Sequence, residues 1–221
     1  MKKIFVYSEG QTEERFIKDL LAPHLETLGI YAQPVLATTK VVKSGPNFKG
    51  GIGDYQRAKK EILHLLGDTS ACAVTTMLDY YGLDRSFPGR SAPIGNDCYE
   101  RVLSVERAFG QDIGEARFVP FLTLHEFEGL LFASPPSMAA ALPGGQYLEG
   151  KFQAIRQQFS RPEEIDDSPA TAPHKRIMDL YPQYRKALHG PLIAARTGLN
   201  KMRGECPHLD EWIRKIESSA S

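Results

Sequence analysis

Acidic side chains follow three apolar segments of this chain, at the point where each segment gives way to polar residues. Glu9 comes after the run 4–7, Asp79 after the run 71–78 and Glu126 after the run 118–124. If these runs are parallel strands, their carboxyl ends meet at one edge of a sheet, where ligands of such sheets bind. Two unpaired carboxylates ~4 Å apart repel by roughly 4 kcal/mol at an effective dielectric constant of ~20. A divalent cation would relieve that repulsion.

Hard cations such as Mg²⁺ or Mn²⁺ take oxygen ligands and retain waters that a phosphate can replace. We therefore predict a metal site with Glu9, Asp79 and Glu126 as ligands, suited to phosphoryl transfer. The alternative is that each acid separately caps a helix or ends a strand in water.

The residues around these acids carry further polar and aromatic groups. His125 is either a ligand or base beside Glu126 or a core histidine, and Glu128 is a candidate to support the ligands through a hydrogen bond. Tyr81 either stacks on a base or covers the edge of the core. The residues expected to support the site are Glu13, Tyr81, Asp84, His125, Glu128 and Arg176.

Basic residues are concentrated in two segments, although the whole chain has a formal net charge of zero. Residues 37–60 contain six cations and one acid, and residues 171–221 contain nine cations and five acids. Lys175 and Arg176, in the second segment, could balance the charge of a phosphate. We expect both segments to flank the acidic site if the substrate is a nucleic acid, although charge runs are also typical of solvated surfaces.

Several other classes of function are disfavoured by the absence of their motifs. The chain has no GxxxxGK[ST] phosphate loop, no HExxH and no GxSxG nucleophile elbow. The glycines at 50, 51 and 53 do not directly follow an expected strand, as a dinucleotide fingerprint requires. Three cysteines without metal-ligand spacing indicate free thiols. No apolar run is long enough to span a bilayer, and we expect a cytoplasmic protein without membrane contact.

The elements that must position the acids alternate between strand and helix. Strands are expected at 4–7, 34–42, 71–78 and 118–124, with helices after Thr12 as N-cap, at 55–66 and at 96–109. A kink is expected at Pro23. This alternation predicts an α/β fold with a mostly parallel four-stranded sheet flanked by helices.

The remainder of the chain reads as helical. Short helical patterns punctuated by proline and glycine occur at 137–142, 152–159, 175–180, 192–197 and 209–216. We expect an α/β core over residues 1–133 and a helical extension over 134–221, packed on the core as one compact unit.

Five motifs give the sequence a family resemblance: Glu9-Gly10-Gln11-Thr12-Glu13, residues 78–83, the His-Glu-Phe-Glu block at 125–132, residues 172–177 and Cys206-Pro207-His208. Over nearly its whole length the chain resembles a bacterial family grouped with the Toprim (topoisomerase-primase) domains. Toprim domains, including those of OLD-type nucleases, hold magnesium with a glutamate after the first strand and a pair of aspartates after the third. The resemblance implies a Toprim-like, Rossmann-like fold.

The same resemblance implies roles for individual residues. Glu9 corresponds to the glutamate, as metal ligand and general acid or base, and Asp79 to the first aspartate. Tyr81 stands at the position of the second aspartate. Either Glu126 or Asp84 supplies the missing carboxylate, or the site binds metal weakly, or this branch has lost catalysis.

From these observations we expect a Mg²⁺- or Mn²⁺-dependent nuclease or related phosphodiester enzyme with Glu9, Asp79, Glu126 and Lys175 in the reaction. Its expected substrate is nucleic acid, above all DNA. The resemblance also implies a partner ATPase and a role in defence against phage. The alternative is a non-catalytic module of the same fold that binds a partner protein or nucleic acid.

Overall fold

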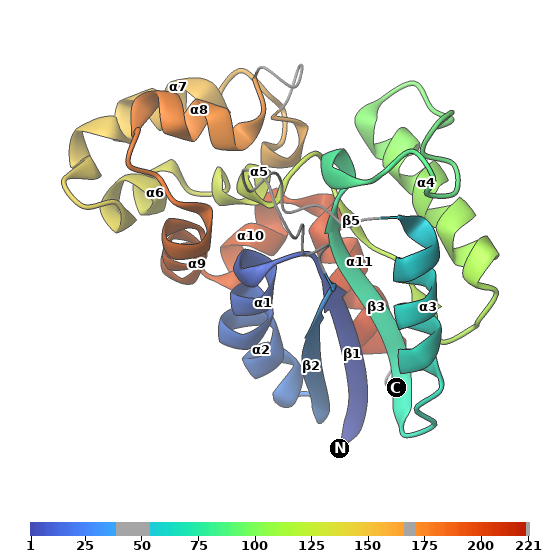
Figure 1. Ribbon diagram of the computed structural model, residues 1–221. Coiled ribbons are helices and arrows are strands. Elements are labelled where there is room, and N and C mark those ends of the chain that lie inside the picture. Colours follow the sequence, from blue (N-terminus) through green and yellow to red (C-terminus); the bar gives the residue numbers. More distant parts are fainter. Residues whose placement is uncertain (39–53, 166–170, 220–221) are drawn as a thin grey trace, which may run out of the picture.

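A parallel β-sheet lies at the centre of the protein, whose computed structural model describes residues 1–38, 54–165 and 171–219 (Figure 1). The strands are β1 (Lys2–Ser8), β2 (Ile30–Leu36), β3 (Ala71–Asp79), β4 (Phe118–Val119) and β5 (Leu122–Thr123). They follow the order β2-β1-β3-β4, with β5 also paired to β3, and every pair is parallel. The predicted α/β class and parallel sheet are confirmed.

The fourth predicted strand is divided in two, so the sheet has five strands and not four. Pro120 separates β4 from β5, and a proline has no N–H to donate to the ladder. Thr76 bridges the gap with its side chain, because its Oγ1 donates to the carbonyl of Phe121 (2.8 Å) and accepts from the N–H of Phe121 (2.9 Å). The two short strands therefore remain in line beside β3.

The second strand lies earlier in the chain than predicted. The sequence pattern predicts a strand at 34–42, whereas β2 spans Ile30–Leu36 and pairs Lys2 with Ile30. Residues 39–42 of the predicted strand lie outside the described residues. Gly29, with φ of 75°, makes the turn that starts it. β2 is an edge strand, where a proline such as Pro34 is tolerated. The predicted glycine-rich loop before residue 54 lies outside the described residues.

The first helical segment differs from its prediction at both marked positions. Gly10, and not Thr12, is the N-cap of α1 (Gln11–Phe16), and Thr12 is buried in the first turn. A π-helical turn (Ile17–Leu21) precedes Pro23 and joins α1 to α2 (Ala22–Glu26). The wider π turn before Pro23 accommodates a residue that lacks an N–H donor.

Helices cover both faces of the sheet, and β1 alternates between them. Ile4 and Val6 pack with α1, α2 and α11 (Pro207–Ser219) on one face, while Phe5 and Tyr7 pack with α3 (Tyr55–Leu66) and α4 (Cys98–Ile113) on the other. Figure 1 shows α1 and α2 on one side of the strands and α3 on the other. α3 has the predicted bounds, and α4 starts two residues later and ends four residues later than predicted.

From residue 127 on, the described residues form helices and the loops that join them, without a strand. Its helices are α5 (Phe127–Leu131), α6 (Pro135–Ala141), α7 (Glu149–Arg156), α8 (Pro173–Leu180), α9 (Lys186–Thr197), α10 (Leu199–Glu205) and α11 (Pro207–Ser219). Short 3₁₀ turns lie at Tyr80–Gly82, Gly145–Leu148 and Pro162–Glu164. Residues from α5 to α11 share one buried apolar cluster with β1 and β3. Within the described part of the chain, no helix has the length and apolar character to cross a membrane.

Buried polar contacts attach α11 to the sheet. The indole N–H of Trp212 donates to Thr75 Oγ1 (2.8 Å), and its ring stacks on Phe121 with centroids 4.2 Å apart. His208 Nε2 lies 3.0 Å from Glu106 of α4, and both side chains are buried. Burial opposes the charge of His208, but the hydrogen bond and charge of Glu106 hold its pKa above the ordinary 6.5. This pair therefore favours the protonated imidazole.

The His208–Glu106 pair predicts a pH-dependent stability. Because the pKa of His208 is raised on folding, its contribution is complete below pH ~6.5 and is lost as pH rises through the folded-state pKa. Glu106→Gln should lower the free energy of unfolding by about 1–3 kcal/mol at pH 6 and by less at pH 8.5. Denaturant unfolding across this range measures both effects. Glu115→Gln, at an exposed acid just after α4, is the control. Parallel curves for wild type and Glu106→Gln would contradict the assignment.

Candidate functional site

A cavity of about 770 Å³ lies at the carboxyl ends of β1 and β3. The acidic residues that line it are Glu9, Glu13, Asp79 and Glu126. The basic residues that line it are Arg90, His174, Lys175 and Lys186. The cavity thus collects the three predicted ligands and Lys175 in one place, together with the supporting residues Glu13 and Tyr81.

Glu9 and Asp79 are joined directly at the ends of neighbouring strands. Glu9 comes one residue after β1, and its Oε2 accepts the backbone N–H of Asp79, the last residue of β3, at 3.3 Å. Gly82 makes room for this carboxylate, because a Cβ there would lie 3.1 and 3.2 Å from the two Glu9 oxygens. The parallel pairing of β1 with β3 therefore decides the position of both acids.

Asp79 also holds the start of α5. Its Oδ1 accepts from Thr123 Oγ1 at 2.7 Å and from the N–H of Phe127 at 2.9 Å. Phe127 is the first residue of α5, so the carboxylate satisfies one of the donors that every helix leaves free at its N-terminus. The capping role considered as an alternative for the acids therefore exists at Asp79, beside its place in the cavity.

Glu13 is the most deeply buried acid of the cavity, with a side chain in the first turn of α1. The sequence placed it only among the supporting residues. Burial, then the charge of Asp79, raises the pKa of Glu13. Burial, then Asp79 and Glu13, raises the pKa of Glu9. Burial raises the pKa of Asp79 to about 6, with Lys186 acting in the opposite direction. The cavity holds more negative charge than its one central ammonium offsets.

Lys186 is that ammonium, and no motif in the sequence singles it out. It is the first residue of α9, and its Nζ lies 2.9 Å from Glu128 and 3.9 Å from Glu126. Burial disfavours its charge, but Glu128, Asp79 and Glu126 raise the pKa of Lys186 above its ordinary value. Lys186 reaches the cavity because α9 packs against α1 and α5. It follows Glu126 by about sixty residues in the chain, so no local pattern indicates that approach.

Glu128 does not line the cavity, and among the described residues its contacts are with Lys186 and Tyr184 and not with the predicted ligands. Its buried carboxylate accepts from Lys186 and from the hydroxyl of Tyr184, at 2.9 and 3.3 Å. Gly190 allows α9 to approach closely, because a Cβ there would lie 2.9 Å from Thr12 of α1. Glu128 thus fixes the position from which Lys186 reaches the acids.

Glu126 is turned toward the cavity by an unusual backbone conformation. His125 before it has φ of 63°, in the left-handed region that few residues other than glycine adopt. Both carboxylate oxygens of Glu126 lie within 2.8 Å of His174 Nδ1. Burial alone would raise the pKa of Glu126, but the hydrogen bond with His174 and the charge of Lys186 hold it below the usual range.

Two expected supporting residues lie away from the cavity. Asp84 Oδ1 accepts the N–H of Ser86 (2.8 Å) in a turn after β3. Arg176 donates from Nε to the carbonyl of Thr171 (2.7 Å) and lies over the ring of Phe159. His125 acts through its backbone, since its carbonyl accepts the N–H of Tyr81 (3.1 Å). Glu126 is among the residues that line the cavity and Asp84 is not, so the geometry favours Glu126 for the place of the missing carboxylate.

The donors at the cavity suit a hard divalent cation in kind, because all are carboxylate oxygens. In the residues with described positions, however, no group of three or more His, Cys, Asp and Glu side chains is arranged to hold a metal ion. Two carboxylates are occupied by other partners, Glu126 by His174 and Asp79 Oδ1 by Thr123 and Phe127. Metal binding stays a prediction. Its candidate ligands are Glu9, Glu13 and Asp79, because the charge of Asp79 raises the pKa of both glutamates.

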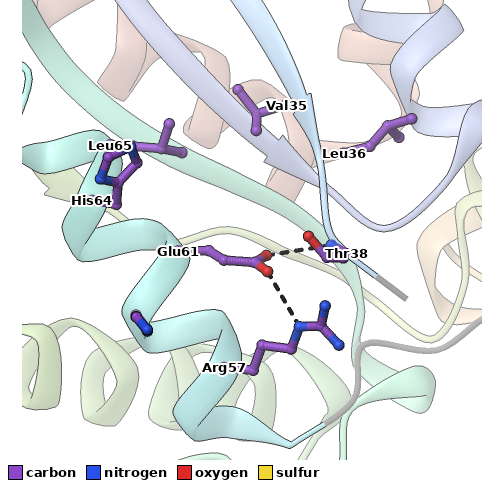
Figure 2. A pocket seen from close by; sticks show the side chains of 8 residues that line it. Val35, Leu36, Thr38, Arg57, Glu61, His64 and Leu65 are labelled. Carbon is purple, nitrogen blue, oxygen red and sulfur yellow. Dashed lines mark hydrogen bonds and ion pairs between the residues drawn. The ribbon is translucent and has the colours of Figure 1, made fainter. Parts of the chain in front are cut away.

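The cations of the two basic segments divide between different places. Lys175 and Lys186 of the second segment line the cavity. Arg57 and Lys60 of the first segment instead line a separate hollow of about 450 Å³ between β2 and α3 (Figure 2). There Arg57 and Thr38 both contact Glu61. Lys59 of the same segment instead pairs with Asp112 at 2.8 Å. The other three cations, Lys40, Lys43 and Lys49, lie in residues 39–53, outside the described residues.

Arg90 is a cavity cation that the sequence did not indicate. It belongs to the loop between β3 and α4, and its guanidinium lies over the ring of Tyr80, 4.3 Å from the centroid. Its Nε is buried, without a hydrogen-bond partner among the described residues. An arginine so held presents planar donors of the kind that bind phosphate.

Comparison with known proteins gives two matches. A family model described as "Domain of unknown function (DUF4276)" matches residues 8–217. Among solved structures, the "C-terminal region of the Burkholderia pseudomallei OLD protein" aligns with a TM-score of 0.44 and 14% sequence identity, over 98% of this chain and 99% of that one. No curated protein matches the chain. The family match spans every residue that lines the cavity.

The two contacts of Asp79 predict opposite effects for two substitutions. Asp79→Asn keeps an oxygen for Thr123 and Phe127 and removes the charge. Because burial raises the pKa of Asp79 from 3.8 to about 6, its ionisation destabilises the fold increasingly between those values. Asp79→Asn should therefore raise Tm at pH 7, by roughly 2–4 °C for each kcal/mol gained, and give no gain below pH ~4.

Asp79→Ala is the matched control, because it removes the charge and the acceptor together. It should melt below Asp79→Asn at every pH, since the buried donors of Thr123 and Phe127 lose their partner at a cost of about 1–3 kcal/mol. Thermal unfolding without divalent metal measures both variants. An Asp79→Asn protein that melts below wild type at pH 7 would show that the capping contact outweighs the repulsion.

Proposed function

The chain belongs to the family described as "Domain of unknown function (DUF4276)", and we propose that it is a divalent-metal-dependent nuclease that hydrolyses DNA at the cavity beyond β1 and β3. One observation carries the proposal. Three acids, the buried Glu13 and the half-buried Glu9 and Asp79, share a cavity with the cations Arg90, Lys175 and Lys186. Metal-dependent hydrolysis of a phosphodiester uses carboxylates that bind the metal and cations that interact with the charge of the phosphate.

The acids would hold the metal. Their raised pKa values mean that the cavity as folded disfavours three simultaneous negative charges. A bound Mg²⁺ or Mn²⁺ would supply the missing positive charge and polarise a phosphoryl oxygen. Glu9 and Glu13 come from one strand-loop-helix unit and Asp79 from the neighbouring strand of the sheet. The sheet would therefore fix the backbone positions of the three ligands.

The cations would orient the substrate. Lys186 is held by Glu128 at the inner side of the cavity, where a phosphoryl oxygen would meet a fixed ammonium. Lys175 is exposed at the start of α8, and Arg90 is braced against Tyr80. Three cations from separate elements suit a chain of phosphates better than a single small anion.

The choice of DNA, the partner ATPase and the role in phage defence rest on the resemblance of the sequence motifs to Toprim domains of OLD-type nucleases. A second candidate is a non-catalytic module that binds nucleic acid or a protein. Tyr81 favours it, because this residue lines the cavity where the resemblance implies a second aspartate. Metal binding separates the two candidates.

Metal binding and cleavage should depend on the same acids. Calorimetry should show Mg²⁺ or Mn²⁺ binding to wild type, and Glu13→Gln and Asp79→Asn should abolish it together with cleavage of linear and supercoiled DNA. Asp84→Asn is the matched control, because it removes an acid that also follows β3 but lies outside the cavity. Cleavage that survives in Asp79→Asn would come from a contaminant or another site. A wild type that binds DNA in the absence of metal and does not cleave it would favour the non-catalytic module.

DNA binding should weaken as salt rises, because phosphate contacts release counterions. Lys175→Ala and Arg90→Ala should each lower affinity and reduce the slope of log K against log salt by about 1. Lys60→Ala, at the separate hollow of Figure 2, should leave the slope unchanged. Fluorescence anisotropy with Ca²⁺ in place of Mg²⁺ measures the slope. Equal slopes in all four proteins would remove the cavity from the DNA interface.

A further inference from the structure

A histidine and a glutamate form a fixed pair at one wall of the cavity. His174 Nδ1 lies 2.8 and 2.6 Å from the two oxygens of Glu126, and the backbone N–H of His174 also donates to Glu126 at 3.3 Å. The two residues are separated by 48 positions in the chain. One ring nitrogen and one backbone N–H of His174 thus both face the same carboxylate, which orients the imidazole.

Both partners are held by their own backbone. His125, in the left-handed region, directs Glu126 toward α8. Pro173 is the first residue of α8, where its fixed φ suits the helix, and Ala172 and Pro173 are buried. The imidazole therefore projects from a rigid helix start and not from a free loop.

The contact with Glu126 also determines which ring nitrogen faces the cavity. A carboxylate accepts hydrogen bonds, so Nδ1 carries the proton that Glu126 receives. In a neutral ring Nε2 then has the lone pair, and it has no hydrogen-bond partner within the described residues, although His174 lines the cavity. A carboxylate on one nitrogen with the other nitrogen directed at a reaction site is the arrangement of a histidine base.

We propose that His174 is the group that takes the proton from the attacking water and that Glu126 is its positioning residue, an inference that rests on the proposed nuclease function. The water oxygen forms a bond to phosphorus while its proton passes to Nε2. The bond from phosphorus to the leaving sugar oxygen breaks with its electron pair, and that oxygen takes a proton from solvent. The imidazolium then returns its proton to solvent.

This assignment changes the role expected for Glu126. Its two oxygens serve His174 and face Lys186 at 3.9 Å, which leaves metal binding to Glu9, Glu13 and Asp79. His174 belongs to the Ala-Pro-His-Lys-Arg segment at 172–176, whose histidine the site prediction did not use. A negative Glu126 also stabilises the imidazolium that forms during the reaction.

His174→Ala and His174→Gln test the proposal by steady-state cleavage of DNA. Both should lower kcat by about 10²–10⁴-fold, with KM and the affinity for Mg²⁺ within a few-fold of wild type. Added imidazole should restore part of the activity of His174→Ala and none of that of Asp79→Asn. His64→Ala, on α3 at the separate hollow, is the control and should keep wild-type activity.

Glu126→Gln should lower kcat less than His174→Ala, because the amide still contacts the ring but no longer stabilises its charge. The double variant should be no worse than His174→Ala alone. Two results would overturn the role of His174 without affecting the nuclease function. One is full activity of His174→Gln. The other is a loss of activity in His174→Ala that imidazole does not relieve, in a protein with wild-type Tm and metal affinity. A wild type that binds no divalent metal and cleaves no DNA overturns the nuclease function and this inference together. Metal-dependent wild-type cleavage therefore distinguishes the two failures.

Discussion

The burial of several carboxylates at the end of a parallel sheet is the constraint on which the rest of this structure depends. β1 and β3 end side by side, so Glu9 and Asp79 meet wherever the sheet forms. Glu13 adds a third acid, whose side chain is buried in the first turn of α1. Burial raises the pKa of all three acids; the charge of Asp79 raises that of Glu9 and Glu13 further, and the charges of Glu128 and Glu126 raise that of Asp79 further. The surrounding elements supply the donors and the ammonium that make this charge tolerable.

The helical second half of the chain serves this constraint. α5 gives Asp79 a backbone donor at Phe127, and α9 brings Lys186 to Glu128 and Glu126. α8 brings His174 to Glu126. The extension shares its apolar cluster with the sheet, so packing and site are formed by the same contacts. A chain ending near residue 133 would contain the acids without the groups that balance them.

The sequence predicted most of the architecture because local patterns carry it. The apolar runs of β1 and β3 and the period of α3 gave the correct elements. The errors arose where local patterns compete with tertiary contacts. Pro120 divides the fourth strand, which the side chain of Thr76 compensates from another strand. The position of the edge strand β2 depends on its pairing with β1, which the local sequence pattern does not contain.

The sequence by itself determined which acids gather at the cavity, since Glu9, Asp79 and Glu126 each follow a recognisable strand and parallel strands end together. Only the tertiary structure decided what those acids contact. Lys186, Arg90 and the ring of His174 reach the cavity from distant elements, and no spacing in the chain records that approach. Whether a carboxylate faces a cation, a helix N-terminus or another carboxylate depends on distances of a few ångströms across the fold, because electrostatic energies in a partly buried site change steeply over that range.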